Sequence, residues 1–164
     1  MGGSNRQYAC LVTRLLLYGY GNDSMVRFLQ VLQQHGITGV LDIRDDGLLI
    51  RNEFNPENLA DLLHRLSIQY SHATPLVIPN SLAHRPRSNG SAGDFLAQYQ
   101  DYLESLGPGE LAELADLLQA GTWLMLCAEE DPDICHRRIA AEFVGRRLGL
   151  PADAIQEVGH SGSV

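Results

Sequence analysis

The segment from residue 127 to residue 138 holds the densest set of reactive side chains in the sequence. It reads Cys-Ala-Glu-Glu-Asp-Pro-Asp-Ile-Cys-His-Arg-Arg. Thiols, an imidazole and carboxylates this close together can supply a nucleophile and proton-transferring groups. The expected structure is a strand ending at Cys127, an acidic turn, and a helix that begins at residues 131–133 and runs to Leu148. A helix N-terminus favours anions and lowers the pKa of a nearby cysteine.

Four side chains of this segment are the candidate catalytic groups. Cys135 is a thiol nucleophile or an anion-site residue, His136 is an acid–base group, and Glu129 and Cys127 complete the set. Adjacent helix residues do not face each other, so a partnership of His136 with Cys127, or of Cys135 with another loop, is favoured over Cys135 with His136. The competing interpretations are a purely structural helix start and, for Cys127, inert packing at the end of a buried strand.

All basic side chains apart from histidine are arginines. Lysine and arginine together number 12, none is a lysine, and the formal net charge is −8. Schiff-base chemistry, a lysine general base and the lysine-bearing phosphate loop are therefore excluded. An anion would be held by arginine or by backbone amides, which favours planar oxyanions.

Side chains near the expected strand ends are the candidate substrate- or anion-binding groups. They are Arg44, Arg137, Arg138, Asp42, Tyr20 and Asn22. Two alternatives stay open: an ion pair of Asp42 with Arg44 that is only structural, and pairing of the other two arginines with nearby acids. Gly19 and Gly21 lack the third glycine of a dinucleotide fingerprint, which favours a tight turn.

Several side chains are chemically suitable for zinc, namely Cys127, Glu129, Cys135, His136 and His160. Their spacing matches no standard finger or deaminase signature. Consecutive residues of a regular helix are also poorly placed to reach one ion. No metal site is therefore assigned and no cofactor is required, with zinc kept as the alternative.

Strand and helix patterns alternate along the chain. Strands are expected at 10–18, 39–43, 67–71, 123–127 and 154–158. Helices are expected after a cap at Asp23 or Ser24, after Asn55, at 92–106, at 108–120 and up to Leu148. Residues 72–93 are expected to form one long irregular loop. This order predicts a single α/β domain with a mainly parallel sheet of about five strands and helices on both faces. The site of such a sheet lies at the carboxyl ends of its strands.

The expected organisation is a flexible N-terminus over 1–9, one domain over 10–160 and a short tail over 161–164. No apolar run is long enough to span a bilayer, and no secretory signal is visible. The 3 cysteines are an odd number without a disulfide framework, which indicates a reducing, cytoplasmic location.

The sequence also resembles domain-of-unknown-function family 488 over about residues 15 to 160. The resemblance rests on Cys127-Ala128-Glu129, Asp131-Pro132, the run 135–138, the turn 18–22, Asp42-Ile43-Arg44, Phe54-Asn55, the spacing of Phe95, Tyr99 and Tyr102, and Gly159-His160. It implies no settled activity. The chain departs from the family pattern at 74–79 and 45–49, in loops that are expected to select the substrate.

The sequence thus favours an enzyme acting on a small oxyanionic or nucleotide-like substrate at the strand ends. The alternative is a non-catalytic ligand- or nucleic-acid-binding module, with Arg85 and Arg87 joining Arg137 and Arg138 in one basic surface. The net negative charge disfavours nucleic acid as a partner, and no membrane partner is expected.

Overall fold

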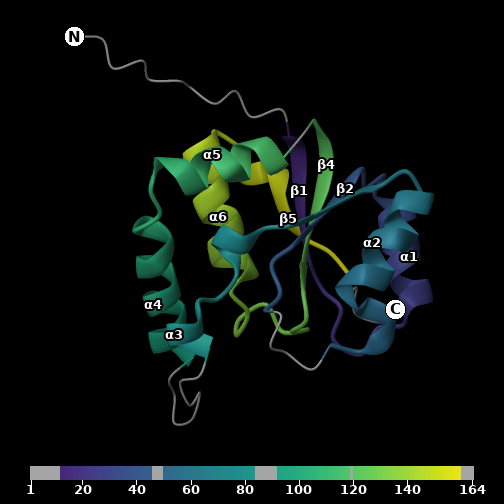
Figure 1. The fold of residues 1–164 in the computed structure, drawn as a ribbon, viewed down its shortest axis with the longest axis horizontal. Coiled ribbons are helices and arrows are strands. Elements are labelled where there is room, and N and C mark those ends of the chain that lie inside the picture. Colours follow the sequence, from purple (N-terminus) through teal and green to yellow (C-terminus); the bar gives the residue numbers. More distant parts are fainter. Residues whose placement is uncertain (1–11, 46–49, 84–91, 119, 160–164) are drawn as a thin grey trace.

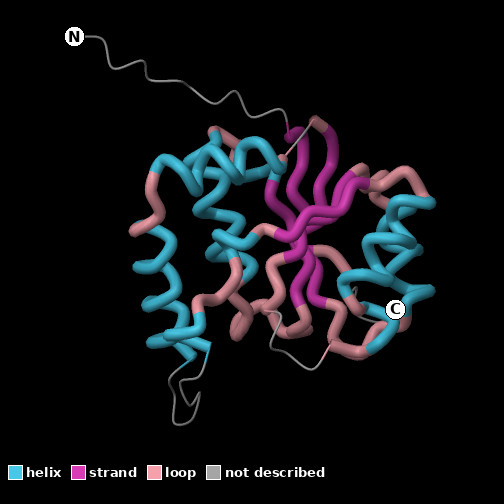
Figure 2. The backbone as a smooth tube through the Cα atoms, in the orientation of Figure 1, coloured by secondary structure: helices cyan, strands magenta, loops and turns pink. Residues whose placement is uncertain are grey.

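A twisted parallel sheet forms the middle of the molecule in the computed structural model, which describes residues 12–45, 50–83, 92–118 and 120–159 (Figures 1 and 2). The strands are β1 (Val12–Gly19), β2 (Gly39–Asp42), β3 (Gln69–His72), β4 (Gly121–Cys127) and β5 (Ile155–Glu157). Their order in the sheet is β3-β2-β4-β1-β5, and every pairing is parallel. The predicted α/β fold with five strands is confirmed.

Helices cover both faces of this sheet. They are α1 (Met25–Gln34), α2 (Pro56–Arg65), α3 (Asn80–Ala83), α4 (Ala92–Glu104), α5 (Pro108–Leu117) and α6 (Arg137–Leu148). Helices α1 and α2 lie on one side of the sheet, and α3 to α6 lie on the other (Figure 1). Ser24 caps α1 by accepting from the amide of Arg27, and Asn55 caps α2 in the same way. Both caps agree with the sequence prediction.

Alternation along the strands builds a separate hydrophobic core on each face. Leu15 and Leu17 pack toward the α4 and α6 side, whereas Leu16 and Tyr18 pack toward α1 and α2. Successive residues of β4 alternate in the same manner. Because side chains of a strand point to opposite faces in turn, the face on which each strand-end residue emerges is already decided by this register.

Two expectations about local structure are wrong. The segment 72–93 is not wholly irregular, because it contains a 3₁₀ turn η2 (Thr74–Leu76) and helix α3; residues 84–91 lie outside the described part. The last long helix begins at Arg137 rather than at residues 131–133. The carboxylate of Asp131 accepts from the amide of Asp133 at 2.9 Å. Asp131, which was expected to begin the helix, therefore stabilises a separate turn that precedes it.

The turn after β1 is locked to the end of β4. The amides of Tyr20 and Gly21 donate to the carbonyls of Cys127 and Ala128 at 3.1 and 3.0 Å. A Cβ atom at Gly19 would lie 1.6 Å from the carbonyl oxygen of Glu129, so only glycine allows this approach. Within the described residues, none of the helices is long and apolar enough to cross a membrane.

Candidate functional site

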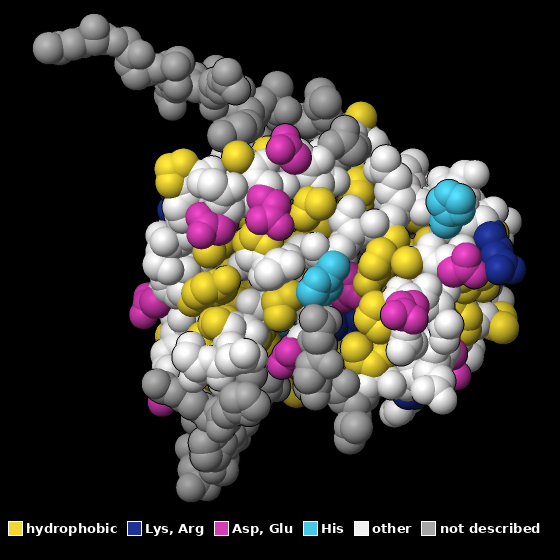
Figure 3. Space-filling view, in the orientation of Figure 1, with side chains coloured by type: hydrophobic (Ala, Val, Ile, Leu, Met, Phe, Trp, Pro, Cys, Tyr) yellow, Lys and Arg dark blue, Asp and Glu magenta, His cyan; other side chains and the backbone are white. Residues whose placement is uncertain are grey.

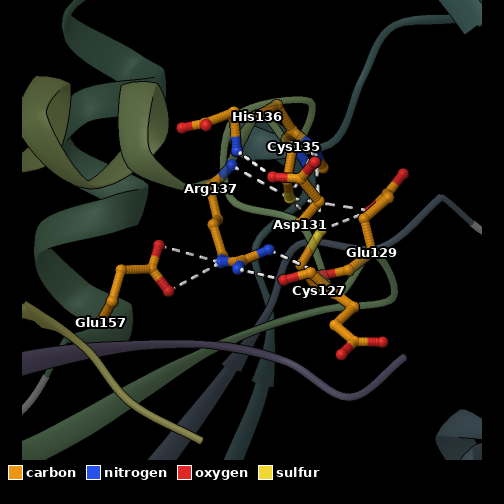
Figure 4. A network of polar contacts seen from close by, with 9 residues as sticks. Cys127, Glu129, Asp131, Cys135, His136, Arg137 and Glu157 are labelled. Carbon is orange, nitrogen blue, oxygen red and sulfur yellow. Dashed lines mark hydrogen bonds and ion pairs between the residues drawn. The ribbon is translucent and has the colours of Figure 1, made fainter. Parts of the chain in front are cut away.

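Four side chains converge where β4 ends and α6 begins (Figure 4). The sulfurs of Cys127 and Cys135 are hydrogen-bonded at 2.8 Å, and a carboxylate oxygen of Glu129 lies 2.8 Å from the Cys127 sulfur. Nδ1 of His136 lies 3.8 Å from the Cys127 sulfur and 4.0 Å from the Cys135 sulfur. We call these four residues the thiol centre. They are the four residues that the sequence singles out as candidate catalytic groups.

The late start of α6 is what brings Cys135 and His136 together. Both residues precede the first helical residue, so the helical-wheel argument against their partnership does not apply to them. The His136 ring faces both sulfurs, including the Cys127 sulfur that the sequence favours as its partner.

The His136 ring is held from two sides. Its Nε2 lies 3.1 Å from the carbonyl oxygen of Ile43, which can only accept, so Nε2 carries a proton and Nδ1 faces the sulfurs. Tyr99 packs edge-on against the ring with centroids 5.1 Å apart, and its own hydroxyl donates to the carbonyl of Leu76. These contacts orient Nδ1 to exchange a proton with a thiol.

The Cys135 thiol is strongly acidified. Burial alone would raise its pKa, but the hydrogen bonds from Cys127 and His136 and the charge of His136 outweigh burial and lower the pKa to about 5. The amide of Arg137, at the start of α6, also donates to the Cys135 sulfur at 3.4 Å. Cys135 is therefore a thiolate at neutral pH.

Cys127 has the opposite protonation. Its burial, together with the negative charge of Cys135 and of Glu129, raises its pKa well above the usual value. Cys127 thus keeps its proton, which lies between two acceptors at 2.8 Å, the Cys135 sulfur and the Glu129 carboxylate. The centre holds one thiolate and one thiol in direct contact.

This division of protons predicts a pH response. In protein carrying Cys10→Ser, the ultraviolet thiolate absorbance should stay constant between about pH 6.5 and 8, because a pKa lowered to about 5 leaves Cys135 ionised throughout that range. Cys135→Ser should abolish this pH-independent thiolate absorbance. Cys127→Ala should make the absorbance of Cys135 rise with pH over this range, because the variant removes a hydrogen-bond donor to the Cys135 sulfur. An absorbance that rises steeply over the same range in the Cys10→Ser protein would contradict the assignment.

Arg137 holds the loop of the thiol centre in place and is not free for an anion. Its Nη1 and Nη2 donate to the carbonyls of Glu129 and Glu130 at 2.7 and 3.0 Å, and its Nε donates to Glu157 of β5 at 3.1 Å (Figure 4). The side chain is only 1% exposed. Every nitrogen of the guanidinium has a protein partner, so its role is to orient the backbone around Glu129.

Asp42 and Arg44 form a buried ion pair with each side chain 1% exposed. Nε and Nη2 of Arg44 donate to the two carboxylate oxygens at 2.9 and 2.7 Å, and Nη1 donates to the carbonyl of Phe54. The hydroxyl of Tyr70 adds a third donor to Asp42. Of the two interpretations of this pair, the geometry favours the structural one.

The ion pair and the thiol centre lie on opposite faces of the sheet. The Arg44 guanidinium lies over the ring of Tyr20, which belongs to the core under α1 and α2. His136 instead packs on Tyr99 of the other core. The sequence expectation that Arg44 and Arg137 grip one anion beside Cys135 is not supported by these positions.

The remaining candidates are scattered. Tyr20 is buried and stacks on Phe54, whereas Asn22 and Arg138 are exposed. Arg85, Arg87 and His160 lie outside the described residues. Basic side chains are sparse and acidic ones are spread over the face shown in Figure 3. With Arg137 buried, the continuous arginine surface of the nucleic-acid alternative has lost one of its members.

The family of the chain follows from its sequence as a whole. The family model described as "Domain of unknown function DUF488" matches residues 24–144. The chain belongs to the DUF488 family. No curated protein and no solved structure gives a significant match. The matched part of the DUF488 domain includes all four residues of the thiol centre, whereas Glu157 on β5 lies beyond it.

The thiol centre of this DUF488 domain contains donors that zinc favours. One donor atom from each of Cys127, Glu129, Cys135 and His136 lies within 4.8 Å of the others. The proton on Nε2 of His136 also suits a metal ligand. However, two thiolates on one tetrahedral zinc ion would be about 3.8 Å apart, from bonds of about 2.3 Å. The observed sulfur separation of 2.8 Å is about 1 Å shorter, so the two sulfurs are in closer contact than in a zinc-bound pair.

A cavity of about 740 Å³ lies beside the DUF488 thiol centre rather than over it. Its walls include Arg27 and His35 of the α1 region, Asp131, and the Arg137–Glu157 pair. No member of the thiol centre lines it. Both sulfurs are buried.

Three supporting groups were not singled out as site residues from the sequence. In the sequence, Tyr99 stands out only through the aromatic spacing that supports the family resemblance, and Ile43 only as the middle residue of Asp42-Ile43-Arg44. Glu157 stands out only as part of a short last strand. The contribution of Ile43 is its backbone carbonyl, for which no side-chain pattern gives a signal. The only signal for Glu157 in the sequence is that an acidic residue lies near the end of the last predicted strand, where it could pair with Arg137 or Arg138.

Proposed function

We propose that this protein is an enzyme in which the Cys135 thiolate is the nucleophile. The observation that supports this most strongly is the contact of the Cys135 sulfur with the sulfur of a second cysteine at 2.8 Å, beside an imidazole nitrogen and a carboxylate. Nucleophile, acid and base are all required for covalent thiol catalysis. Purely structural cysteines need none of these partners.

Each partner has a distinct role in the proposed chemistry. Cys135 attacks an electrophilic atom of the substrate. His136 donates a proton from Nδ1 to the leaving group, and its Nε2 contact with Ile43 keeps the ring facing the sulfurs. Glu129 lies 2.8 Å from the Cys127 sulfur and is placed to accept that thiol's proton.

The substrate is proposed to be a small electrophile. The sequence favours an oxyanionic or nucleotide-like molecule, but Arg44 and Arg137 donate from every guanidinium nitrogen to protein oxygens. The buried position of both sulfurs favours a compact reactant. A binding module without catalysis would not need an ionised thiol at its buried centre.

The test is the pH profile of alkylation by iodoacetamide, with the modified cysteine identified by peptide mass spectrometry. At pH values below its pKa of about 8.5, an ordinary thiol reacts about tenfold faster for each unit by which the pH is raised, because the thiolate is the reactive form. Cys135 should instead react at a constant rate between about pH 6 and 8. The profile is more informative than the absolute rate, because a low-pKa thiolate is also intrinsically less nucleophilic.

His136→Gln should restore the ordinary rise with pH at Cys135, and Cys10→Ser should leave the Cys135 profile unchanged. Alkylation of Cys135 that rises tenfold per pH unit in the native protein would overturn the proposal. Stoichiometric zinc in the purified protein that protects both thiols until it is chelated would also overturn it, in favour of a metal centre.

A further inference from the structure

We propose that the substrate of the thiol centre is a hydroperoxide and that the catalytic cycle closes a disulfide between Cys127 and Cys135. This inference rests on the proposed function, because it requires Cys135 as the nucleophile. It goes further by naming the electrophilic atom, the product and the role of the second cysteine.

The position of Cys127 is the first reason. Single-cysteine nucleophiles need only a base, whereas here a second thiol lies 2.8 Å from the nucleophilic sulfur. A disulfide bond is about 2.05 Å long, so the sulfurs need to approach by only about 0.8 Å more. Cys127 ends β4 and Cys135 precedes α6, and the turn between them brings both sulfurs to one point.

Burial and charge are the second reason. Cys127 and Cys135 are 0% and 2% exposed, and the cavity beside them does not reach the sulfurs. The Glu129 carboxylate and the Cys135 thiolate also give the centre negative charge, which disfavours an anionic reactant. A hydroperoxide is small and uncharged, and it carries its electrophilic oxygen at one end.

The first step oxidises Cys135. Its thiolate attacks the terminal peroxide oxygen, the O–O bond breaks, and Cys135 becomes a sulfenic acid. The leaving alkoxide or hydroxide takes the proton that Nδ1 of His136 received from the Cys135 thiol, and departs as an alcohol or as water. The sulfur loses two electrons and the peroxide gains them.

The second step consumes the Cys127 thiol. Glu129 accepts the Cys127 proton as the Cys127 sulfur attacks the Cys135 sulfur, and the S–O bond breaks. The released hydroxide leaves as water with that same proton. The sum is one thiol, one thiolate–imidazolium pair and one hydroperoxide converted into one disulfide, one alcohol and one water. An external thiol or dithiol then reduces the disulfide and completes the cycle.

The experiment uses the full chain with Cys10→Ser, so that any disulfide joins Cys127 to Cys135. Reduced protein is mixed with one equivalent of hydrogen peroxide, remaining thiols are blocked with N-ethylmaleimide, and intact mass is recorded over time. The expected result is loss of two hydrogens with no blocking group added. Dithiothreitol should reverse it.

Matched variants assign the steps. Cys127→Ser should stop at a sulfenic acid on Cys135 that dimedone traps, and Cys135→Ser should react at least about a hundredfold more slowly with peroxide. Glu129→Gln should slow disulfide closure about a hundredfold, because it removes the base of the second step, so the sulfenic acid on Cys135 should accumulate before the disulfide forms.

Failure of this inference is distinguishable from failure of the proposed function. If Cys135 shows the constant alkylation profile but peroxide gives no disulfide, or oxidises Cys135 to a sulfinic acid while Cys127 stays free, the peroxide inference is wrong and the thiol enzyme stands. If alkylation of Cys135 follows an ordinary thiol profile, both proposals are wrong.

Discussion

Replacing Arg44 with methionine should lower the free energy of unfolding by about 3–5 kcal/mol, as expected when one partner of a buried ion pair is removed. Asp42 is 1% exposed and would lose two charge-assisted hydrogen bonds from the guanidinium. It would keep two donors, the hydroxyl of Tyr70 and the backbone amide of residue 44. The carbonyl of Phe54 would also lose its partner. An uncompensated carboxylate in the core under α1 and α2 accounts for most of the loss.

Chemical denaturation of the variant and the native protein measures this effect. The matched control is Arg65→Met on α2, whose ion pair with Asp61 has side chains 74% and 64% exposed. Exposed pairs one helical turn apart contribute about 0.5 kcal/mol or less, so this control should be nearly neutral. Combining Arg44→Met with Asp42→Leu should recover much of the loss by removing the stranded charge. Equal stabilities of Arg44→Met and Arg65→Met would refute the structural role of the pair.

Arg137→Met should be comparably destabilising and should also disturb the thiol centre. The variant leaves the carbonyls of Glu129 and Glu130 without their guanidinium donors and removes the cation paired with Glu157. We expect a loss of about 3 kcal/mol or more in the free energy of unfolding. Burial already raises the pKa of Glu157 while Arg137 lowers it, so the variant should raise that pKa further.

Arg138→Met is the matched control, because this neighbouring arginine is exposed. Denaturation should show a large loss for Arg137→Met and little change for Arg138→Met. If Arg137 instead served to hold an anion, its replacement would leave stability nearly intact and abolish only ligand binding. That outcome would contradict the positioning role.

The element order was predictable because local signals and tertiary structure agree over most of the chain. Several of these signals depend only on residues that are close in the sequence. They are the caps Ser24 and Asn55, the glycine that ends α6 and the apolar run of β4. The start of α6 was not predictable in this way. Asp131 offers the same oxygen to a helix cap and to a separate turn, and only the packing of the following residues decides between the two.

The composition of the site was also largely predictable, whereas its grouping was not. From the sequence, Cys135 and His136 are not expected to be partners, because adjacent residues of a helix point in different directions. Arg44 and Arg137 are expected to lie in one site, because both follow the ends of parallel strands. The structure reverses both. Cys135 and His136 precede the helix and meet at Cys127, while Arg44 emerges on the opposite face of the sheet.

By itself, the sequence determined a parallel α/β domain of the DUF488 family with its reactive side chains between Cys127 and Arg138. Only the tertiary structure decided which of them lie together. Strand alternation assigns Asp42 and Arg44 to one face, and the turn that delays α6 brings two sulfurs, an imidazole and a carboxylate together on the other. Residue types limit the chemistry that a chain can perform, but protonation states depend on burial and on neighbours that are distant in the sequence. The lowered pKa of Cys135 and the raised pKa of Cys127 are consequences of that packing.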